Sequence, residues 1–229
     1  MSLRAPVVRA RWCDIDRIVD LITGALSPTA LGAWLVPDEH RQRSVLAAAT
    51  RIWTEHALLF GDAFLLQDGS AATVWFHRYR PIPPPPGFED RLAAACGEHH
   101  QRFLFLDQAL AARRPAEPHN HLAFLAAPPG PEGVERAAAV LTGGQRWMDT
   151  LNLPTYAEAY TPVHRELYRR HGYADRDEFP LPGGLTAHQM WRLSPHWANP
   201  LSANSAAHWA ARPADGRARN DRLTSWALH

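Results

Sequence analysis

The chain contains no lysine, only two cysteines and no long apolar run, and each absence limits what the protein can be. All 24 basic residues are arginines, which is typical of a high-GC bacterial genome. Cys13 and Cys96 are too few for a disulfide framework, so a reducing compartment fits best. No segment approaches the roughly 20 apolar residues of a membrane helix, and residues 1–11 lack the apolar core of a signal peptide. We therefore expect a soluble, cytoplasmic protein that has no membrane partner.

The remaining composition is that of a globular domain with an appended segment. Hydrophobic residues make up 46% of the 229 residues and charged residues 21%, while the net charge is +1. This balance excludes a broad basic surface for nucleic acid and leaves only a small local patch open. The periodic pattern fades beyond Ser194, so we predict one domain over 1–193 and an extension over 194–229. Three tryptophans make the extension too apolar for a purely solvated linker: Trp197, Trp209 and Trp226.

Hydrophobic periodicity and turn residues predict alternating strands and helices. Asp68-Gly69-Ser70 supplies a hairpin turn between two apolar runs, and four consecutive prolines make 81–87 an extended loop. Strands are expected at 7–11, 63–67, 71–78, 122–127, 155–160, 173–179 and 185–193. Helices are expected at 15–26, 38–60, 88–114 with a break near Gly97, 132–151 and 162–171. This order indicates an α/β fold with a mixed central sheet.

Four short sequence blocks carry a family resemblance. They are PHNHLAFLA at 118–126, PTYAEA at 154–159, RELYRRHGY at 165–173 and GGLTAHQMWR at 183–192. Together, and in this order, they resemble the GNAT superfamily of acyl-CoA N-acyltransferases over 7–193. The resemblance implies a sheet of about seven strands, flanked by helices and splayed between strands four and five. In that family the pantetheine arm of the donor lies in the gap and pairs with the fourth strand, here by position with Leu125, Ala126 and Ala127.

The resemblance also implies the residues that move protons. The matching family tyrosine lies near the thioester sulfur, so Tyr168 is expected to protonate the departing thiolate. Glu158 on the fifth strand, or His119 or His121 at the start of the fourth, is the candidate base for the amine, and alternation puts both histidines on one face. His164 stands where the family often has asparagine near the donor. A purely structural role stays open for each residue, and no metal-ligand spacing accompanies the histidines, so no metal is expected.

The loop after the fourth strand departs from the family pattern. The family motif is Arg/Gln-x-x-Gly-x-Gly/Ala, whose glycines let backbone amides approach the CoA pyrophosphate at a helix N-terminus. Alignment on Pro129-Gly130 places Glu135 at the central glycine and Glu132 at the first polar position. The six aligned donor-binding positions are Glu132, Gly133, Val134, Glu135, Arg136 and Ala137.

Glu135 weakens the case for acetyl-CoA as the donor. A carboxylate about 4 Å from a phosphate charge costs about 1 kcal/mol in water and about 4 kcal/mol at the effective dielectric of a protein surface. These energies correspond to roughly tenfold to thousandfold weaker binding. Glu132 and Glu135 suit the first turn of a helix, where each gains a few tenths to about 1 kcal/mol from the dipole. Arg136 offers partial compensation, so we expect weakened rather than absent CoA binding.

Three functions are consistent with these residues. The first is an N-acyltransferase that joins acetyl-CoA or another acyl-CoA to a small amine, with candidate acceptor residues Trp34, Trp75, His77 and Phe105. The second keeps the chemistry but takes an aminoacyl-tRNA or a carrier-protein thioester as donor, with the extension touching RNA through Arg212, Arg217, Arg219 and Arg222. The third is a noncatalytic binding module on the same fold. We expect a monomer or a homodimer.

Overall fold

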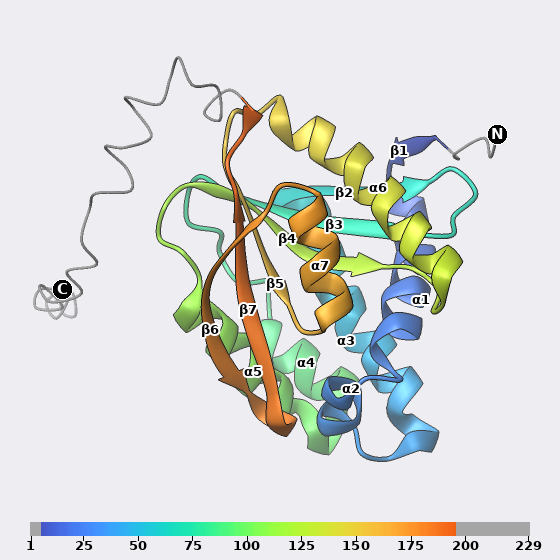
Figure 1. Cartoon of the computed structure of the whole chain (residues 1–229). Coiled ribbons are helices and arrows are strands. Elements are labelled where there is room, and N and C mark those ends of the chain that lie inside the picture. Colours follow the sequence, from blue (N-terminus) through green and yellow to red (C-terminus); the bar gives the residue numbers. More distant parts are fainter. Residues whose placement is uncertain (1–5, 196–229) are drawn as a thin grey trace, which may run out of the picture.

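One seven-stranded mixed sheet organises residues 6–195, the part of the chain that the computed structural model describes (Figure 1). The strand order is β1-β2-β3-β4-β5-β7-β6; β4 and β5 are parallel and the other neighbours are antiparallel. The strands are β1 (Val7–Arg9), β2 (Gly61–Leu66), β3 (Ala72–Arg78), β4 (His119–Ala126), β5 (Thr155–Ala159), β6 (Ala174–Leu181) and β7 (Leu185–Arg192). The predicted mixed sheet of about seven strands is confirmed. The tryptophans and arginines predicted to act in the tail lie outside the described residues.

Helices cover both faces of the sheet. α1 (Ile15–Leu26) and α3 (Glu39–Phe60) pack on one face of β2, β3 and β4, and α6 (Pro131–Asp149) packs on the other face of these strands. α7 (Pro162–Arg170) packs on the same side as α6, against β5, β6 and β7. The first layer continues through α2 (Ala30–Leu35), α4 (Phe88–Cys96) and α5 (His100–Arg113). Figure 1 shows the long β6–β7 hairpin reaching toward α2 and α5. Short 3-10 helices lie at Trp12–Asp14, Gly97–His99 and Pro182–Gly184.

The predicted elements differ from the observed ones mainly where polar residues are buried or a helix is short. The first strand ends at Arg9, and β4 begins at His119 rather than at Leu122, because His119 and its two polar neighbours are buried strand residues. The helix α2 was not predicted; its six residues are too few for a clear period, although Thr29 caps it by accepting from Gly32 N at 3.0 Å. None of the helices between residues 6 and 195 has the length and apolar composition needed to cross a bilayer.

Two glycines inside α6 let this helix approach the sheet closely. A Cβ atom at Gly143 would lie 2.4 Å from Val7 Cγ2, and one at Gly144 would lie 3.1 Å from both Thr73 Oγ1 and Trp75 Nε1. Glycine costs about 1 kcal/mol relative to alanine in a helix interior. Here that cost is offset by tight packing of α6 on β1 and β3, which closes the core on this face.

Candidate active site

The parallel strands β4 and β5 pair only over their first residues. Asn120–Leu122 pair with Thr155–Ala157, whereas the rest of β4, through Ala126, pairs with β3 alone among the described strands. The β3–β4 register shifts beside Val74, where Ala123 has no partner on β3. This bulge bends β4 at the point where it leaves β5. The strands therefore part, and the predicted donor residues Leu125 and Ala126 lie on the separated segment of β4.

The two faces of the sheet carry different side chains at this opening. Successive strand residues point to opposite faces, so Tyr156 and Glu158 lie on the face that α5 covers, while Ala157 and Ala159 face α7. The imidazole rings of His119 and His121 lie 5.5 and 5.2 Å from the Tyr156 ring, which places them on the α5 face too. The predicted common face of the two histidines is therefore present.

Glu158 and His121 form a buried hydrogen-bonded pair on the α5 face. Their Oε2 and Nε2 atoms are 2.9 Å apart, and each residue is 6% exposed. Arg78 Nε donates to His121 Nδ1 at 3.4 Å, so the imidazole proton is on Nε2 and points at the carboxylate. Burial lowers the pKa of His121, which stays neutral. Burial by itself would raise the pKa of Glu158, but His121 and then Arg114 lower it overall, so the carboxylate is ionised.

His119 and Gln189 complete the inner wall around Tyr156. His119 is 1% exposed; its Nδ1–H donates to Glu117 O at 2.6 Å, and burial lowers its pKa to about 4. Gln189 lies directly opposite Glu158 in the β5–β7 register and donates from Nε2 to the Tyr156 hydroxyl at 3.2 Å. His119 Nε2 and Glu158 Oε1 are buried and have no hydrogen-bond partner within the described residues. These atoms face a site whose polar groups are incompletely satisfied.

Charged residues that sequence reasoning did not select surround this pair. Burial, and then the charge of Arg114, lower the pKa of Arg78 to about 10. Burial raises the pKa of Asp107 on α5. No sequence motif distinguishes these residues from ordinary surface charges, because their proximity depends on how the end of α5 folds over β4 and β5.

Tyr168 lies on the opposite face, at the end of α7. Thr161 Oγ1 accepts from His164 N at 3.1 Å and starts the helix, and Gly172, at φ +85°, ends it. Tyr173 N donates to Tyr168 O at 3.1 Å and Gly172 N donates to Arg169 O at 3.0 Å, the pattern of a Schellman motif. The two tyrosine rings are 5.4 Å apart. This local geometry fixes Tyr168, which is 3% exposed and packs with Ala157 and Ala159.

The environment of Tyr168 keeps its hydroxyl protonated. Burial first, followed by Tyr173 and Glu158, raises its pKa above the usual value for tyrosine. Glu158 lies on β5 between Ala157 and Ala159, which share a core cluster with Tyr168, so the carboxylate and the tyrosine lie on opposite faces of the same strand segment. His164 packs beside Tyr168 with ring centroids 6.2 Å apart, and burial lowers its pKa. Both residues lie on α7, as the sequence predicts.

The N-terminus of α6 is a poor cradle for a pyrophosphate. Pro131 is the first helical residue and has no N–H, and Val134 N already donates to Gly130 O at 3.2 Å. In the first turn of α6, therefore, only the amides of Glu132 and Gly133 are free of hydrogen bonds within the helix. The Glu132 side chain is exposed and lies 3.4 Å from Arg136 Nη2. Glu135 is exposed in the second turn rather than in the predicted first turn, where the helix dipole would favour it more. Ala137 is buried beneath the helix.

Gly133 is the one position of this loop where a side chain cannot fit. A Cβ atom there would lie 1.7 Å from Pro128 O, so α6 rests directly on the chain that leaves β4. The aligned glycine thus serves the close approach of two backbone segments. Ala127 lies just before that segment and packs at the edge of the core.

The four predicted acceptor residues fall into two separate groups. Trp34 on α2 and Phe105 on α5 pack together with ring centroids 6.4 Å apart, and Phe105 is 56% exposed. Trp75 is fully buried under α6 on the other face. His77 lies on that face too: its Nδ1 is 2.9 Å from Asn120 Oδ1 and its Nε2 is 3.0 Å from Asp62 Oδ2. The structure therefore brings Trp34 and Phe105 together but places Trp75 and His77 away from them.

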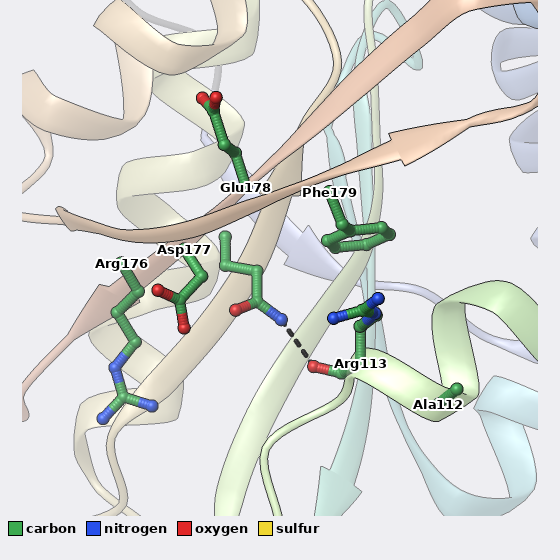
Figure 2. A pocket seen from close by; sticks show the side chains of 7 residues that line it. Ala112, Arg113, Arg176, Asp177, Glu178 and Phe179 are labelled. Atoms are coloured by element: carbon green, nitrogen blue, oxygen red, sulfur yellow. Dashed lines mark hydrogen bonds between the residues drawn. The ribbon is translucent and has the colours of Figure 1, made fainter. Parts of the chain in front are cut away.

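A surface pocket of about 720 Å³ opens between the end of α5 and β6, beside Gln189 (Figure 2). The Gln189 amide donates to Arg113 O, the dashed line in Figure 2, and Arg113 lies under the Phe179 ring at 5.9 Å. Asp177 and Glu178 both line the pocket, and their side chains point in opposite directions from β6 in Figure 2; Glu178 pairs with His188. Gln189 also donates to the Tyr156 hydroxyl, so it connects the lining of this pocket to the wall around Tyr156.

The architecture is that of GNAT acyltransferases, and solved structures of that fold resemble it. A Corynebacterium glutamicum protein named histone acetyltransferase HPA2 and related acetyltransferase aligns with a TM-score of 0.63 and 21% identity, over 82% of this chain and 95% of that chain. A Drosophila melanogaster polyamine N-acetyltransferase aligns with a TM-score of 0.59 and 17% identity, over 82% and 99% of the two chains.

A third similar structure is the C-terminal condensation domain of Ebony in complex with beta-alanyl-dopamine. It aligns with a TM-score of 0.57 and 13% identity, over 82% of this chain and 98% of that chain. No protein-family model matches the chain. The shared feature is the fold, and the predicted GNAT architecture is confirmed. Donor and acceptor therefore have to be argued from the residues of this chain.

Proposed function

We propose that this protein is an N-acyltransferase that moves an acyl group from a thioester to an amine. The observation that carries the proposal is the opening between β4 and β5, with an ionised Glu158 on one face and a protonated Tyr168 on the other. Groups with separated pKa values can act as base and acid in one reaction. A thioester whose carbonyl lies in the opening would meet both.

The reaction needs two proton transfers, and the proposal assigns one residue to each. As the amine nitrogen bonds to the carbonyl carbon, Glu158 accepts the amine proton, while His121 holds the carboxylate through the bond from Nε2–H. As the carbon–sulfur bond breaks, Tyr168 gives its proton to the thiolate. The products are an amide and a free thiol, and the two residues regain their starting states by proton exchange with solvent. His119, neutral and buried, supports the wall around Tyr156.

Release of free thiol tests this function directly. Purified protein is mixed with a panel of amines and one of two donors, acetyl-CoA or the acetyl thioester of N-acetylcysteamine, which keeps the pantetheine end and lacks the pyrophosphate. We expect thiol release that depends on the amine and amide products identified by mass spectrometry. Absence of any amide with both donors and with charged tRNA would remove the enzymatic proposal.

A donor without a pyrophosphate is a second candidate, and the N-terminus of α6 favours it. Pro131 removes one amide and two exposed glutamates add negative charge, so this end of the helix offers little to a pyrophosphate. An aminoacyl-tRNA or a carrier-protein thioester places no pyrophosphate there. Comparable kcat/KM values for acetyl-CoA and the N-acetylcysteamine thioester would support this donor class. Values for acetyl-CoA that are about a hundredfold higher would favour acetyl-CoA or another acyl-CoA, because that gap is the contribution of binding groups beyond pantetheine.

A noncatalytic binding module is the third candidate. It requires a site that holds ligands without moving protons, whereas the separated states of Glu158 and Tyr168 are arranged for proton transfer. Turnover that depends on both residues would exclude it. A cytoplasmic location and a monomeric or homodimeric state stay predictions from the sequence.

A further inference from the structure

The α5 face holds two cationic side chains that the proposed proton transfers do not use. Arg78, at the end of β3, and Arg114, just after α5, are both half-buried. Neither guanidinium forms an ion pair with a carboxylate of residues 6–195. Arg114 Nε is inaccessible to solvent and has no hydrogen-bond partner in that part of the chain. Arg78 lies over the Phe76 ring at 5.1 Å, but neither half-buried cation is in an ion pair, so a ligand carboxylate would give both the anionic partner that burial favours.

Arg114 follows Arg113, whose carbonyl accepts a hydrogen bond from Gln189, the residue opposite Glu158 in the β5–β7 register. In keeping with that position, the charge of Arg114 contributes to the pKa shifts of His121 and Glu158. Arg78 is held in place by the bond from its Nε to His121 Nδ1 at 3.4 Å. Arg78 therefore adjoins the Glu158–His121 pair, and Arg114 follows the residue that Gln189 joins to the same side of β5, near the carboxylate proposed as the base.

The charges that face this cluster balance without forming ion pairs. Two cations, Arg78 and Arg114, stand against two carboxylates, Glu158 and Asp107, and the described residues form no ion pair between the two sets. A ligand that carries one positive and one negative group would complement both sets. A simple amine would pair only with the carboxylates and would leave both guanidinium groups without an anionic partner. Guanidinium groups match the planar geometry of a carboxylate, which they bind through two parallel hydrogen bonds.

We propose that the acceptor is an amino acid, whose amine faces Glu158 and whose carboxylate lies between Arg78 and Arg114. This inference rests on the proposed acyl transfer and names the acceptor class for it. In this proposal the pocket in Figure 2 is the route to the site, since both Arg113 and Gln189 line it. Gln189 stands opposite Glu158 in the register, so its amide must move from Arg113 O to admit the acceptor.

Matched pairs of acceptors test the proposal. Each pair is an amino acid and the amine that remains when its carboxylate is removed: glycine and methylamine, β-alanine and ethylamine, 4-aminobutyrate and propylamine, phenylalanine and 2-phenylethylamine. Acetyl-CoA and the N-acetylcysteamine thioester serve in turn as donors. We expect at least one amino acid to exceed its amine about 100-fold or more in kcat/KM, because a site built for a polar group rejects the analogue that lacks it. The preferred chain length reports the distance from Glu158 to the two arginines.

Two variants link that preference to the arginines. Arg114→Gln and Arg78→Gln should each raise the KM of the preferred amino acid roughly tenfold to a hundredfold, and that of its matched amine far less, since a charge-assisted hydrogen bond is lost only by the former. Arg114→Lys, which keeps the charge but not the planar fork, should restore part of the affinity. Arg43→Gln is the matched control, because Arg43 is exposed on α3. Circular dichroism confirms that each variant is folded.

Calorimetric titration with the preferred amino acid adds a measurement that needs no turnover. Binding by the unmodified protein and loss of binding in Arg114→Gln would support the acceptor site even if every donor failed in the assay. Efficient acylation of the amines without preference for the amino acids would overturn this proposal and leave the acyl transfer standing. Neither binding of amino acids nor acylation of any amine would overturn both.

Discussion

The two faces of the sheet at the β4–β5 opening hold their ionisable groups in opposite states. On the α5 face, burial works to raise the pKa of Glu158, but His121 and Arg114 lower it overall. On the α7 face, burial among aromatic rings raises the pKa of Tyr168, which keeps its proton. The difference lies in the neighbours, because both residues are nearly inaccessible to solvent. Burial alone therefore does not decide the charge of a group; the partners that burial brings with it do.

The largest effect that would test this contrast comes from removing the negative charge on the α5 face. Glu158→Gln keeps the shape of the side chain and should lower kcat/KM by about 100-fold to 10,000-fold, the usual contribution of a general base. Steady-state assays measure the loss. Glu166→Gln, on the outer surface of α7, is the matched control and should retain full activity. A Glu158→Gln enzyme with unchanged kcat/KM would place the base elsewhere.

Protonation of His119 would add positive charge to the α5 face, and it should make the stability of the folded protein depend on pH. His119 has a pKa of about 4 in the folded protein and about 6.5 when unfolded, so the unfolded chain binds more protons as the pH falls between these values. Its contribution to the free energy of unfolding is full above pH 6.5 and should decrease by about 3 kcal/mol by pH 4.

Urea unfolding at pH 7 and pH 4 measures this decrease. His119→Asn retains a donor for Glu117 O and cannot titrate, so its free energy of unfolding should fall less between the two pH values. An equal fall in both proteins would show that His119 is not held neutral by its surroundings.

Removing the acid on the α7 face should have a smaller effect than removing the base. Tyr168→Phe deletes the hydroxyl and keeps the ring that packs on Tyr173. We expect kcat to fall roughly tenfold to a hundredfold, because a thiolate is a good leaving group and depends only partly on protonation by an acid. An acyl donor with a poorer leaving group, such as an oxygen ester, should magnify the loss. If Tyr168→Phe were as active as the unmodified protein with both donors, Tyr168 would have no part in the reaction.

The smallest expected effect concerns the donor end of the α7 face, at the start of α6. Glu135→Gln should strengthen CoA binding by up to about tenfold at low ionic strength, since it removes a repulsion worth about 1 kcal/mol or more. Calorimetry at low and high salt measures the gain, which should fade as salt screens the charge. Glu39→Gln removes an exposed carboxylate from the first turn of a different helix, α3, and should leave CoA binding unchanged. If CoA affinity did not increase at either salt concentration, Glu135 would not be what weakens CoA binding.

The placement of Tyr168 could be predicted because its causes are local. Pro162 at the start of α7 and Gly172 after its end fix the bounds of the helix from adjacent residues alone. The same holds for the hairpin turn at Gly69, which adopts φ +67°. The missed beginning of β4 has the opposite cause. His119 and Asn120 fall outside the apolar run that predicts this strand, because their burial depends on partners that are distant in sequence.

The acceptor side could not be predicted from local pattern. Trp75 and Trp34 are both aromatic residues in plausible positions, yet one is closed under α6 and the other packs beside the exposed Phe105. Nothing in the strand pattern of β3 says which of its two faces meets α6 and which meets α3. That choice is made by how the helices pack, including the close approach that Gly144 allows.

The sequence by itself determined the order of the elements, the ends of the helices and the residue types at the opening, because propensity, capping and turn chemistry act over a few residues. Only the tertiary structure decided that His121 would reach Glu158, 37 positions away, and that Gln189 would stand opposite Glu158. It also decided that β4 would bulge at Ala123 where it leaves β5. Such contacts depend on strand register, which is set by the packing of the whole sheet rather than by neighbouring residues.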